Sequence, residues 1–242
     1  NKLMIVDAET EEDLAVIATV AGYFGRRVLP SGSAGLANYL FERNADVKPL
    51  TDIVVTNNYQ PVLTVVGTRH PSTVAQVLQL KNEENCSFVL CDTDKLVNQS
   101  SQDIAKQATL TVPEADHIVV TTKKIYEGKA HGCNKAQPTN ISNKDIVEAV
   151  TEIAATLIHK MKIQAVIVTG GETAGRLIEK LGAVQLNLLA EPIAGVAAGV
   201  IQTAEDGDIL IATKSGGFGG QDTLENLADY MAAAKVVQVN NL

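Results

Sequence analysis

The sequence has no tryptophan, few aromatic residues and only three cysteines. Cys86, Cys91 and Cys133 form no C-x-x-C pair, and a sparse, odd set of this kind does not build a disulfide framework. We therefore expect the reducing environment of the cytoplasm. His131 stands close to Cys133, but no second pair of residues with metal-ligand spacing occurs elsewhere, so no metal-ligating residue is predicted.

Long apolar runs and clusters of basic residues are also missing. No apolar stretch approaches the roughly 18 residues that a membrane-spanning helix needs. The 20 Lys and Arg residues are outnumbered by 28 Asp and Glu residues, which gives a formal net charge of -8. Nucleic acid and anionic membranes both require clustered positive charge, so neither is expected as a partner. Any bound phosphate must then be held by backbone N–H groups, helix N-termini and one or two lysines.

Apolar runs of strand length alternate with segments of helical periodicity along the chain. The runs predict strands at residues 3–6, 27–29, 62–66, 87–90, 117–121, 165–168, 184–189 and 209–212. Helices are predicted at residues 10–24, 33–42, 72–80, 142–160, 173–181 and 222–234, with one or two short helices within residues 92–115. Continuous apolar strands separated by helices favour an α/β fold, Rossmann-like, with a mainly parallel sheet covered by helices on both faces. Ligands of such sheets bind beyond the carboxyl ends of the strands.

A polar, irregular stretch at residues 44–61 is the best candidate for a linker between domains, because it combines asparagine, aspartate and proline without periodicity. We place the domain boundary within it. Residues 1–50 then form one part together with the linker, and residues 51–242 form the α/β domain.

Glycine-containing loops follow three of the predicted strands. Gly67 ends the run 62–66, Gly170-Gly171 follows the run 165–168, and four glycines that include Gly216 and Gly217 follow the run 209–212. Glycines allow positive φ and close approach of a ligand. A helix that follows directs its unpaired N–H groups and the positive end of its dipole to the same place. Lys214 would add the full positive charge that a transferring phosphoryl group requires.

Several interpretations of these loops are open. Each glycine pair is also compatible with an ordinary tight turn. The sequence has no G-x-x-x-x-G-K-[ST] motif, which excludes a P-loop, and no G-x-G-x-x-G followed by an acidic residue, which disfavours a dinucleotide-binding dehydrogenase domain. The residues by themselves predict a non-P-loop anion or phosphate site on an α/β sheet.

Five segments, in the same order along the chain, resemble the four-carbon acid sugar kinase family. They are Ser31-Gly-Ser-Ala-Gly-Leu36, Gly67-Thr-Arg-His-Pro71 with Gln76, Thr169-Gly-Gly-Glu-Thr-Ala174, Glu191-Pro-Ile-Ala-Gly-Val196 and Thr213-Lys-Ser-Gly-Gly-Phe-Gly219. In that family, phosphoryl transfer from ATP is made to threonate, erythronate or their oxo relatives. The resemblance implies that residues 1–50 are the end of an amino-terminal substrate-binding domain with its linker, and that residues 51–242 are the nucleotide-binding domain.

The resemblance also implies residue roles. It assigns nucleotide contacts to Ser33, Gly170, Gly171, Glu172, Thr173 and Gly216. The loop argument adds Gly67, Lys214 and Gly217 to the predicted ATP-binding residues. Glu172 stands where many relatives have Asp, and either carboxylate is suited to meet Mg²⁺ directly or through water. ATP and Mg²⁺ are therefore the predicted cofactors.

One departure from the family is an absence. The Asp-Asp-Leu-Thr-Gly-Ala signature of the substrate side does not occur in the sequence, so we expect the acid-sugar pocket and the catalytic base to lie outside this chain. No catalytic residue is assigned. The chain also begins without Met inside an apolar run, which we interpret as a fragment or a processed chain.

Two functions from different classes remain open. One is the ATP-binding part of a sugar-acid kinase, a phosphotransferase acting on an alcohol group, whose partners are a nucleotide and a small acidic sugar. The alternative is a non-catalytic nucleotide-binding or regulatory α/β module. The length of the parent reading frame distinguishes the two, and a homodimer is compatible with either.

Overall fold

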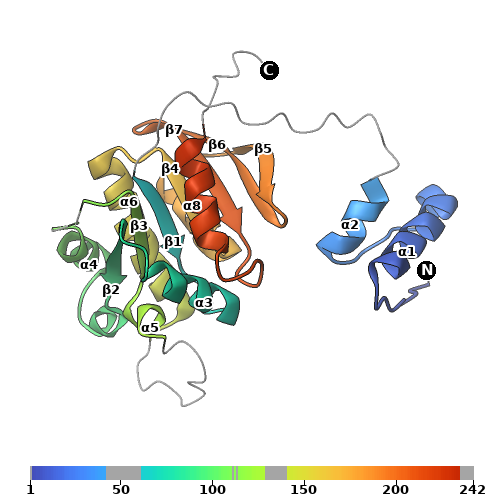
Figure 1. Cartoon of the computed structure of the whole chain (residues 1–242), viewed down its shortest axis with the longest axis horizontal. Helices are drawn as coiled ribbons and strands as arrows, with labels where there is room; N and C mark the ends of the chain where they lie inside the picture. Colours follow the sequence, from blue (N-terminus) through green and yellow to red (C-terminus); the bar gives the residue numbers. More distant parts are fainter. Residues whose placement is uncertain (1, 42–60, 111, 113, 129–140, 235–242) are drawn as a thin grey trace. The chain divides into compact units, whose positions relative to one another are not determined.

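The computed structural model describes residues 2–41, 61–110, 112, 114–128 and 141–234. The chain divides into two compact units, Asn1–Leu50 and Thr51–Leu242 (Figure 1). The predicted linker, apart from its last residue, and the pair of His131 and Cys133 lie outside the described residues. The assignment of the first unit to a substrate-binding domain stays a prediction.

The first unit is helical in its described part. It contains α1 (Glu11–Phe24), the 3-10 helix η1 (Gly25–Arg27) and α2 (Ala34–Phe41). Helix α1 begins at a capping box, in which the Thr10 hydroxyl accepts the N–H of Asp13 and the Asp13 carboxylate accepts the N–H of Thr10 at 2.8 Å. Both capping bonds satisfy N–H groups that the first turn leaves unpaired, which explains why the helix starts here.

The two strands predicted for the first unit, at residues 3–6 and 27–29, are wrong. Neither segment forms a strand, and Leu3 is 91% exposed. A strand needs a hydrogen-bonded neighbour, and no described residue pairs with either segment. Apolar composition alone therefore misled the prediction.

The second unit is built on a seven-stranded sheet with the order β2-β3-β1-β4-β7-β6-β5. The strands are β1 (Val62–Val66), β2 (Cys86–Cys91), β3 (His117–Thr122), β4 (Ala165–Thr169), β5 (Leu186–Ile193), β6 (Val196–Thr203) and β7 (Gly207–Lys214). The first five strands in this order, β2, β3, β1, β4 and β7, are parallel to their neighbours. Strand β6 runs antiparallel to both β7 and β5. The predicted α/β fold with a mainly parallel sheet is confirmed. The strand predicted at residues 184–189 overlaps β5, whereas β6 and the antiparallel direction of this edge were not predicted.

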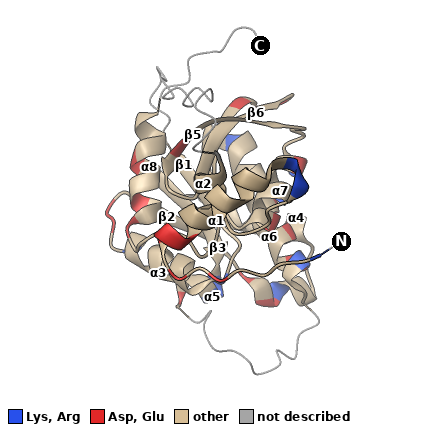
Figure 2. Cartoon of the chain, turned by 90° about the vertical axis from the view of Figure 1, so that its right-hand side faces the viewer, with Lys and Arg blue, Asp and Glu red and all other residues tan. Residues whose placement is uncertain are grey.

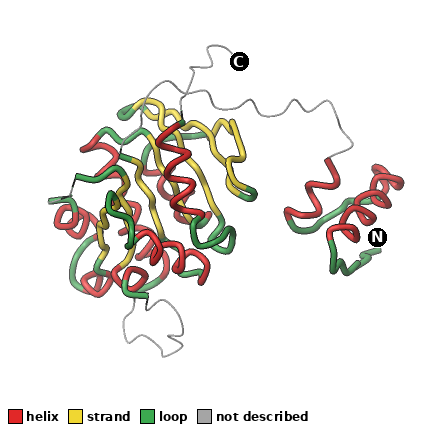
Figure 3. The backbone as a smooth tube through the Cα atoms, in the orientation of Figure 1, coloured by secondary structure: helices red, strands yellow, loops and turns green. Residues whose placement is uncertain are grey.

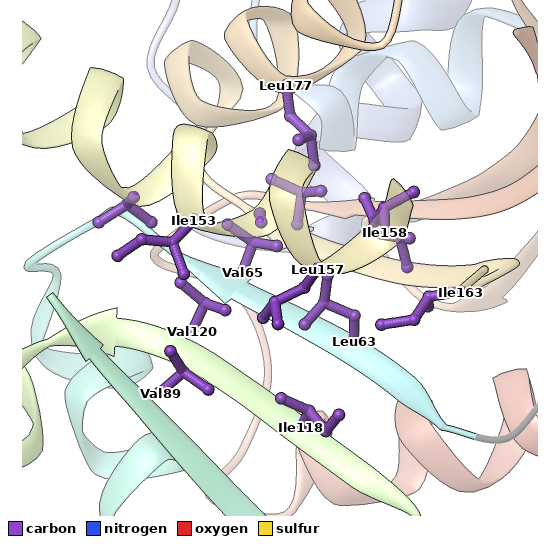
Figure 4. Close-up of a cluster of buried hydrophobic side chains, with 14 of the residues drawn as sticks. Leu63, Val65, Val89, Ile118, Val120, Ile153, Leu157, Ile158, Ile163 and Leu177 are labelled. Carbon is purple, nitrogen blue, oxygen red and sulfur yellow. The ribbon is translucent and has the colours of Figure 1, made fainter. Parts of the chain in front are cut away.

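Helices cover both faces of the sheet. Figure 3 shows the strands in yellow between helices in red. One face carries α4 (Ser101–Ala108), α6 (Asn143–Met161) and α7 (Gly171–Lys180), and the other carries α3 (Pro71–Leu80), α5 (Lys123–Tyr126) and α8 (Thr223–Ala233); η2 (Thr93–Val97) follows β2. Figure 4 shows Ile153 and Leu157 of α6 packed with Leu63 and Val65 of β1. Strands β1 and β4 are buried at every position, which is why their sequences are continuous apolar runs.

The strand register brings three loops to one level of the sheet. Val66 pairs with Thr169, and Thr169 pairs with Lys214, so β1, β4 and β7 end side by side. From β1 the chain crosses to β2 on one side, and from β4 it continues toward β7 on the other. Crevices in open α/β sheets form at such a switch point, outside the carboxyl ends of the strands.

Candidate functional site

A cavity of about 430 Å³ opens at this switch point, between the loops that follow β1 and β4. Its lining residues come from five elements and their loops: Gly67, Thr68, Arg69, His70, Thr93, Thr122, Lys124, Ile141, Asn143, Ile146, Val147, Gly170, Gly171, Glu172 and Thr173. Ile141, Ile146 and Val147 give it an apolar wall. The loops that follow β1 and β4 contribute backbone groups and polar side chains to the rest of the lining. The cavity can therefore accept a ligand with one apolar and one polar end.

The N-terminus of α7 lines the polar side of the cavity. Gly170 is the N-cap residue with φ 91°, and no side chain caps the helix. The Gly170 N–H donates to the Lys214 carbonyl oxygen at 2.9 Å, which ties the β4 loop to the end of β7. A Cβ atom at Gly171 would meet nothing within 4 Å. The first turn of α7 therefore presents uncapped N–H groups next to open space, which suits an anion.

Gly67 lets the β1 loop approach this helix closely. A Cβ atom at Gly67 would overlap the hydroxyl oxygen of Thr173 and lie 3.1 Å from its Cγ2 atom. Thr173 is buried and has little room to move away. A glycine is thus required here for packing of the β1 loop against α7, whatever the cavity binds.

Among the lining residues, two cations, Arg69 and Lys124, outnumber one carboxylate. Arg69 donates from Nη2 to Asn143 Oδ1 at 2.8 Å, and Lys124 Nζ lies 3.0 Å from Asp94 Oδ1. Glu172 is the one carboxylate among the lining residues. In a chain with a net charge of -8, the two cations in the lining together with the α7 N-terminus favour a negatively charged ligand.

The loop after β7 lies beside the β1 loop. A Cβ atom at Gly216 would be 2.7 Å from the hydroxyl oxygen of Thr68, and one at Gly217 would be 3.4 Å from the His70 ring. Lys214 is only 2% exposed, and its ammonium donates to the carbonyl oxygens of Ser215 at 2.9 Å and Phe218 at 2.8 Å. Burial lowers the pKa of Lys214 to about 8. In this structure the ammonium therefore holds the loop.

The structure brings most of the predicted ATP-binding residues together. Gly67, Gly170, Gly171, Glu172 and Thr173 line the cavity, and Gly216 and Gly217 lie against its β1 loop. Lys214 is not among the lining residues. Ser33 belongs to the first unit, where its carbonyl oxygen accepts the N–H of Ala37 in α2. The roles of all nine residues in nucleotide binding stay predictions.

Arg69 and Lys124 line the cavity but were not predicted from the sequence, and the same holds for Thr68, Thr93 and Thr122. A signal for Lys124 was present, because Thr122 and two lysines directly follow a predicted strand, as Gly67 does. The rule that ligands bind at the carboxyl ends of strands, applied to this strand also, would have selected it.

A second cavity, of about 470 Å³, lies at the amino ends of β1 and β3 and has the opposite charge. Its lining includes the carboxylates of Glu83, Glu84, Asp116, Glu225 and Asp229. Figure 2 shows the acidic residues along α8 and basic residues on α7. Within the described ranges, no group of three or more His, Cys, Asp and Glu residues could hold a metal ion. An anion therefore fits the first cavity and not the second.

Together, fold and cavity define a class: a Rossmann-like α/β domain with a glycine-lined site at a helix N-terminus that is not a P-loop. The family described as a nucleotide-binding C-terminal domain matches residues 63–224. The chain belongs to the four-carbon acid sugar kinase family through this domain.

Known relatives agree with this assignment. The chain is 25% identical to a D-threonate kinase of Salmonella typhimurium, over 95% of this chain and 54% of that enzyme. It is 36% identical, over 43% of its length, to a 3-oxo-tetronate kinase of Methylobacterium radiotolerans, of which it covers 22%. The chain thus spans about half the length of the D-threonate kinase it matches.

A solved structure shares the fold. It is a domain of unknown function from Bordetella bronchiseptica, a domain-swapped dimer with bound citrate, at a TM-score of 0.59 and 22% identity. The match covers 96% of this chain and 53% of that one. Within the described segments, no helix has the length and apolar character that crossing a bilayer requires.

Proposed function

We propose that this chain binds ATP with Mg²⁺ and supplies the nucleotide side of a phosphoryl transfer to a four-carbon acid sugar. The acceptor would be of the threonate, erythronate or 3-oxo-tetronate type, in line with the names of the related kinases. The related D-threonate kinase is about twice as long as the part that this chain matches. The phosphoryl transfer is therefore proposed for a whole protein of that length and not for this chain alone.

The observation that carries the proposal is that glycine-containing loops after β1, β4 and β7 lie side by side at the carboxyl ends of these strands. Gly67, Gly170 and Gly171 surround a cavity that also contains the uncapped N-terminus of α7. Phosphate groups need backbone N–H donors that a ligand can approach without meeting a side chain. An apolar wall of Ile146 and Val147 next to these donors suits the base and sugar of a nucleotide.

Different residues of the chain would bind the phosphates and supply positive charge. The first turn of α7 and the loop around Gly216 would hold the phosphates through backbone N–H groups, and Arg69 and Lys124 would add charge. Such preorganised donors stabilise the charge that develops on a transferring phosphoryl group. Thr173 would fix the distance between the β1 and β4 loops through its contact with Gly67.

The residues present also fit a magnesium ion held chiefly by the nucleotide. Mg²⁺ at nucleotide sites takes one or two carboxylates, with phosphate oxygens and water completing its octahedron. Glu172 supplies one exposed carboxylate in the cavity, directly after Gly171. When bound, the ion would neutralise phosphate charge.

Titration of the 242-residue chain with nucleotides tests the proposal. Isothermal calorimetry with ADP and ATP, with and without Mg²⁺, should show saturable 1:1 binding, and adenosine should bind more weakly because it lacks the phosphates. NAD⁺ serves as the control for a dinucleotide domain. Binding of NAD⁺ in preference to ADP, or no binding of either ADP or ATP, would reject the proposal.

A further inference from the structure

Buried side chains hold the carbonyl groups of the loop that follows β7. We define the glycine loop as residues 215–220. The Thr73 hydroxyl donates to the Gly216 carbonyl oxygen at 2.8 Å, and Lys214 donates to the carbonyl oxygens of Ser215 and Phe218. One further side chain donates to the carbonyl oxygens of the last three residues of the loop, Phe218, Gly219 and Gly220.

That donor is the side-chain amide of Gln76 on α3. Its Nε2 atom lies 3.1 Å from the carbonyl oxygen of Phe218, 3.3 Å from that of Gly219 and 2.8 Å from that of Gly220. Gln76 is fully buried, and its Oε1 atom has no hydrogen-bond partner among the described residues. Exchange of the two amide atoms would place Oε1 against three carbonyl oxygens, so electrostatic repulsion allows only the observed orientation.

Both residues of α3 that contact the loop lie on one face of the helix. Thr73 and Gln76 are three positions apart and project to the same side. Helix α3 itself begins directly after the β1 loop, with His70 as its N-cap residue. The helix therefore links the position of the β1 loop, which lines the cavity, to the conformation of the glycine loop.

The direction of the loop carbonyls decides the direction of its N–H groups. Five of the six carbonyl groups accept from α3 or Lys214, and in a trans peptide the N–H of the following residue points opposite to the carbonyl, away from these donors. Within the described residues only one N–H group of the loop, that of Phe218, donates to another backbone group, the Ser215 carbonyl oxygen at 3.3 Å. Successive free N–H groups on one side of a loop form a concave anion site.

We propose that Gln76 is a positioning residue, which orients the glycine loop so that its N–H groups bind the phosphates of the nucleotide. This inference rests on the proposed function, because it assigns the phosphate end of the ligand to this loop. It extends that function to a residue that lies outside the cavity and touches no ligand.

The test compares two glutamines on the same helix. Gln76→Met removes the donor at nearly constant volume, and Gln79→Met makes the same change at a half-buried position one turn later. We expect Gln76→Met to raise the Kd for ADP about tenfold or more, and the Kd for adenosine less than about threefold, because only the phosphates depend on the loop. Amide hydrogen exchange of residues 215–220 should become faster without ligand, and Gln79→Met should leave all three quantities unchanged.

Thr73→Val provides a second, nearly isosteric variant if Gln76→Met folds poorly. It removes one donor to the loop, so we expect a rise of about threefold in the Kd for ADP with adenosine again unaffected. Unchanged loop exchange in Gln76→Met, or equal losses for ADP and adenosine, would overturn the inference. Failure of the unsubstituted chain to bind ADP would instead reject the proposed function, and faster loop exchange in Gln76→Met would still support positioning by Gln76.

Discussion

Glycines around the cavity differ in the space that surrounds them, and this difference makes them separable by mutation. A side chain at Gly171 would point into open space, whereas one at Gly67 would overlap Thr173. A Cβ atom at Gly216 would be 2.7 Å from the Thr68 hydroxyl oxygen, so a Gly216 variant would be strained before any ligand is added. Gly171 is therefore the position at which ligand approach can be tested by itself.

We expect Gly171→Val to abolish nucleotide binding while leaving the apo fold intact. The side chain would fill the space in front of the α7 N-terminus, where the phosphates are proposed to lie, without contacting the protein. Thermal melts measure both effects: the apo Tm should change little, and the rise in Tm caused by ADP should disappear. A persistent ADP-induced rise would place the phosphates elsewhere.

Gly67→Ala should instead destabilise the apo protein, by about 1–3 kcal/mol, because the added methyl group overpacks the contact with buried Thr173. Gly175→Ala is the matched control in the interior of α7, where an added Cβ meets nothing within 4 Å. There the better helix propensity of alanine should stabilise by up to about 1 kcal/mol. Urea unfolding of both variants checks the opposite signs.

At the scale of elements, an ion network joins α6 to α7 beside the site. Glu148 accepts from Arg176 Nε and from Lys180 Nζ, each at 2.6 Å, and Lys180 also contacts Glu152. The hydrogen bond from Arg176 lowers the pKa of Glu148. The network fixes α7, whose N-terminus forms the proposed phosphate site, against the helix that supplies the apolar wall.

We expect Glu148→Gln to reduce the free energy of unfolding by about 0.5–1 kcal/mol at pH 7, a magnitude suited to a partly exposed network. Because the carboxylate is stabilised in the folded state, its contribution is fully present above the usual pKa of Glu and is lost as the pH falls through the lowered pKa of the folded state. Urea unfolding should therefore show a gap between the variant and the unsubstituted chain at pH 7 that narrows as the pH falls below the usual pKa of Glu. A gap of constant size would mean that packing, not charge, is lost.

At the scale of the whole molecule, His117 makes stability depend on pH. Burial lowers the pKa of His117 to about 4, and its Nε2 atom lies 2.7 Å from the Thr64 hydroxyl oxygen. The unfolded chain binds a proton at this residue below about pH 6.5 and the folded chain does not, so stability falls as the pH drops from about 6.5 to 4. Between pH 7 and pH 5 the free energy of unfolding should fall by about 1–2 kcal/mol, a magnitude suited to a partly exposed residue. Urea unfolding of His117→Gln should lack this component of the pH slope.

Phosphoryl transfer needs an acceptor site and a base as well as a nucleotide site. Because the Asp-Asp-Leu-Thr-Gly-Ala signature is absent, we expect the 242 residues to bind ATP or ADP but to transfer no phosphoryl group to threonate or erythronate. A coupled assay that detects ADP formation, run with each acid and without acid, measures this. Turnover above the acid-free rate would show that an acceptor site and a base lie within the chain.

The sequence by itself determined the parallel core of the sheet and the loops that matter. Strands β1 and β4 are buried on both faces, so every residue must be apolar or small, and a continuous run of this kind is visible without a structure. Gly67 and Gly170-Gly171 follow these runs directly, and parallel strands bring their carboxyl ends to one edge. The fold and the approximate place of the candidate cavity could therefore be predicted from local pattern and one topological rule.

Tertiary structure alone decided the edge of the sheet and the direction of individual side chains. Strand β6 contains small and polar residues whose pairing depends on β7 and β5, and residues 3–6 are as apolar as a strand but pair with no described residue. Lys214 follows a strand in the sequence as a phosphate-binding lysine would, yet its ammonium bonds to the loop carbonyls that surround it. Gln76 meets carbonyl groups more than 140 positions further along the chain. Sequence periodicity reports which side of its own element a residue faces, whereas a hydrogen bond is fixed by the position of its partner, which only the packed chain provides.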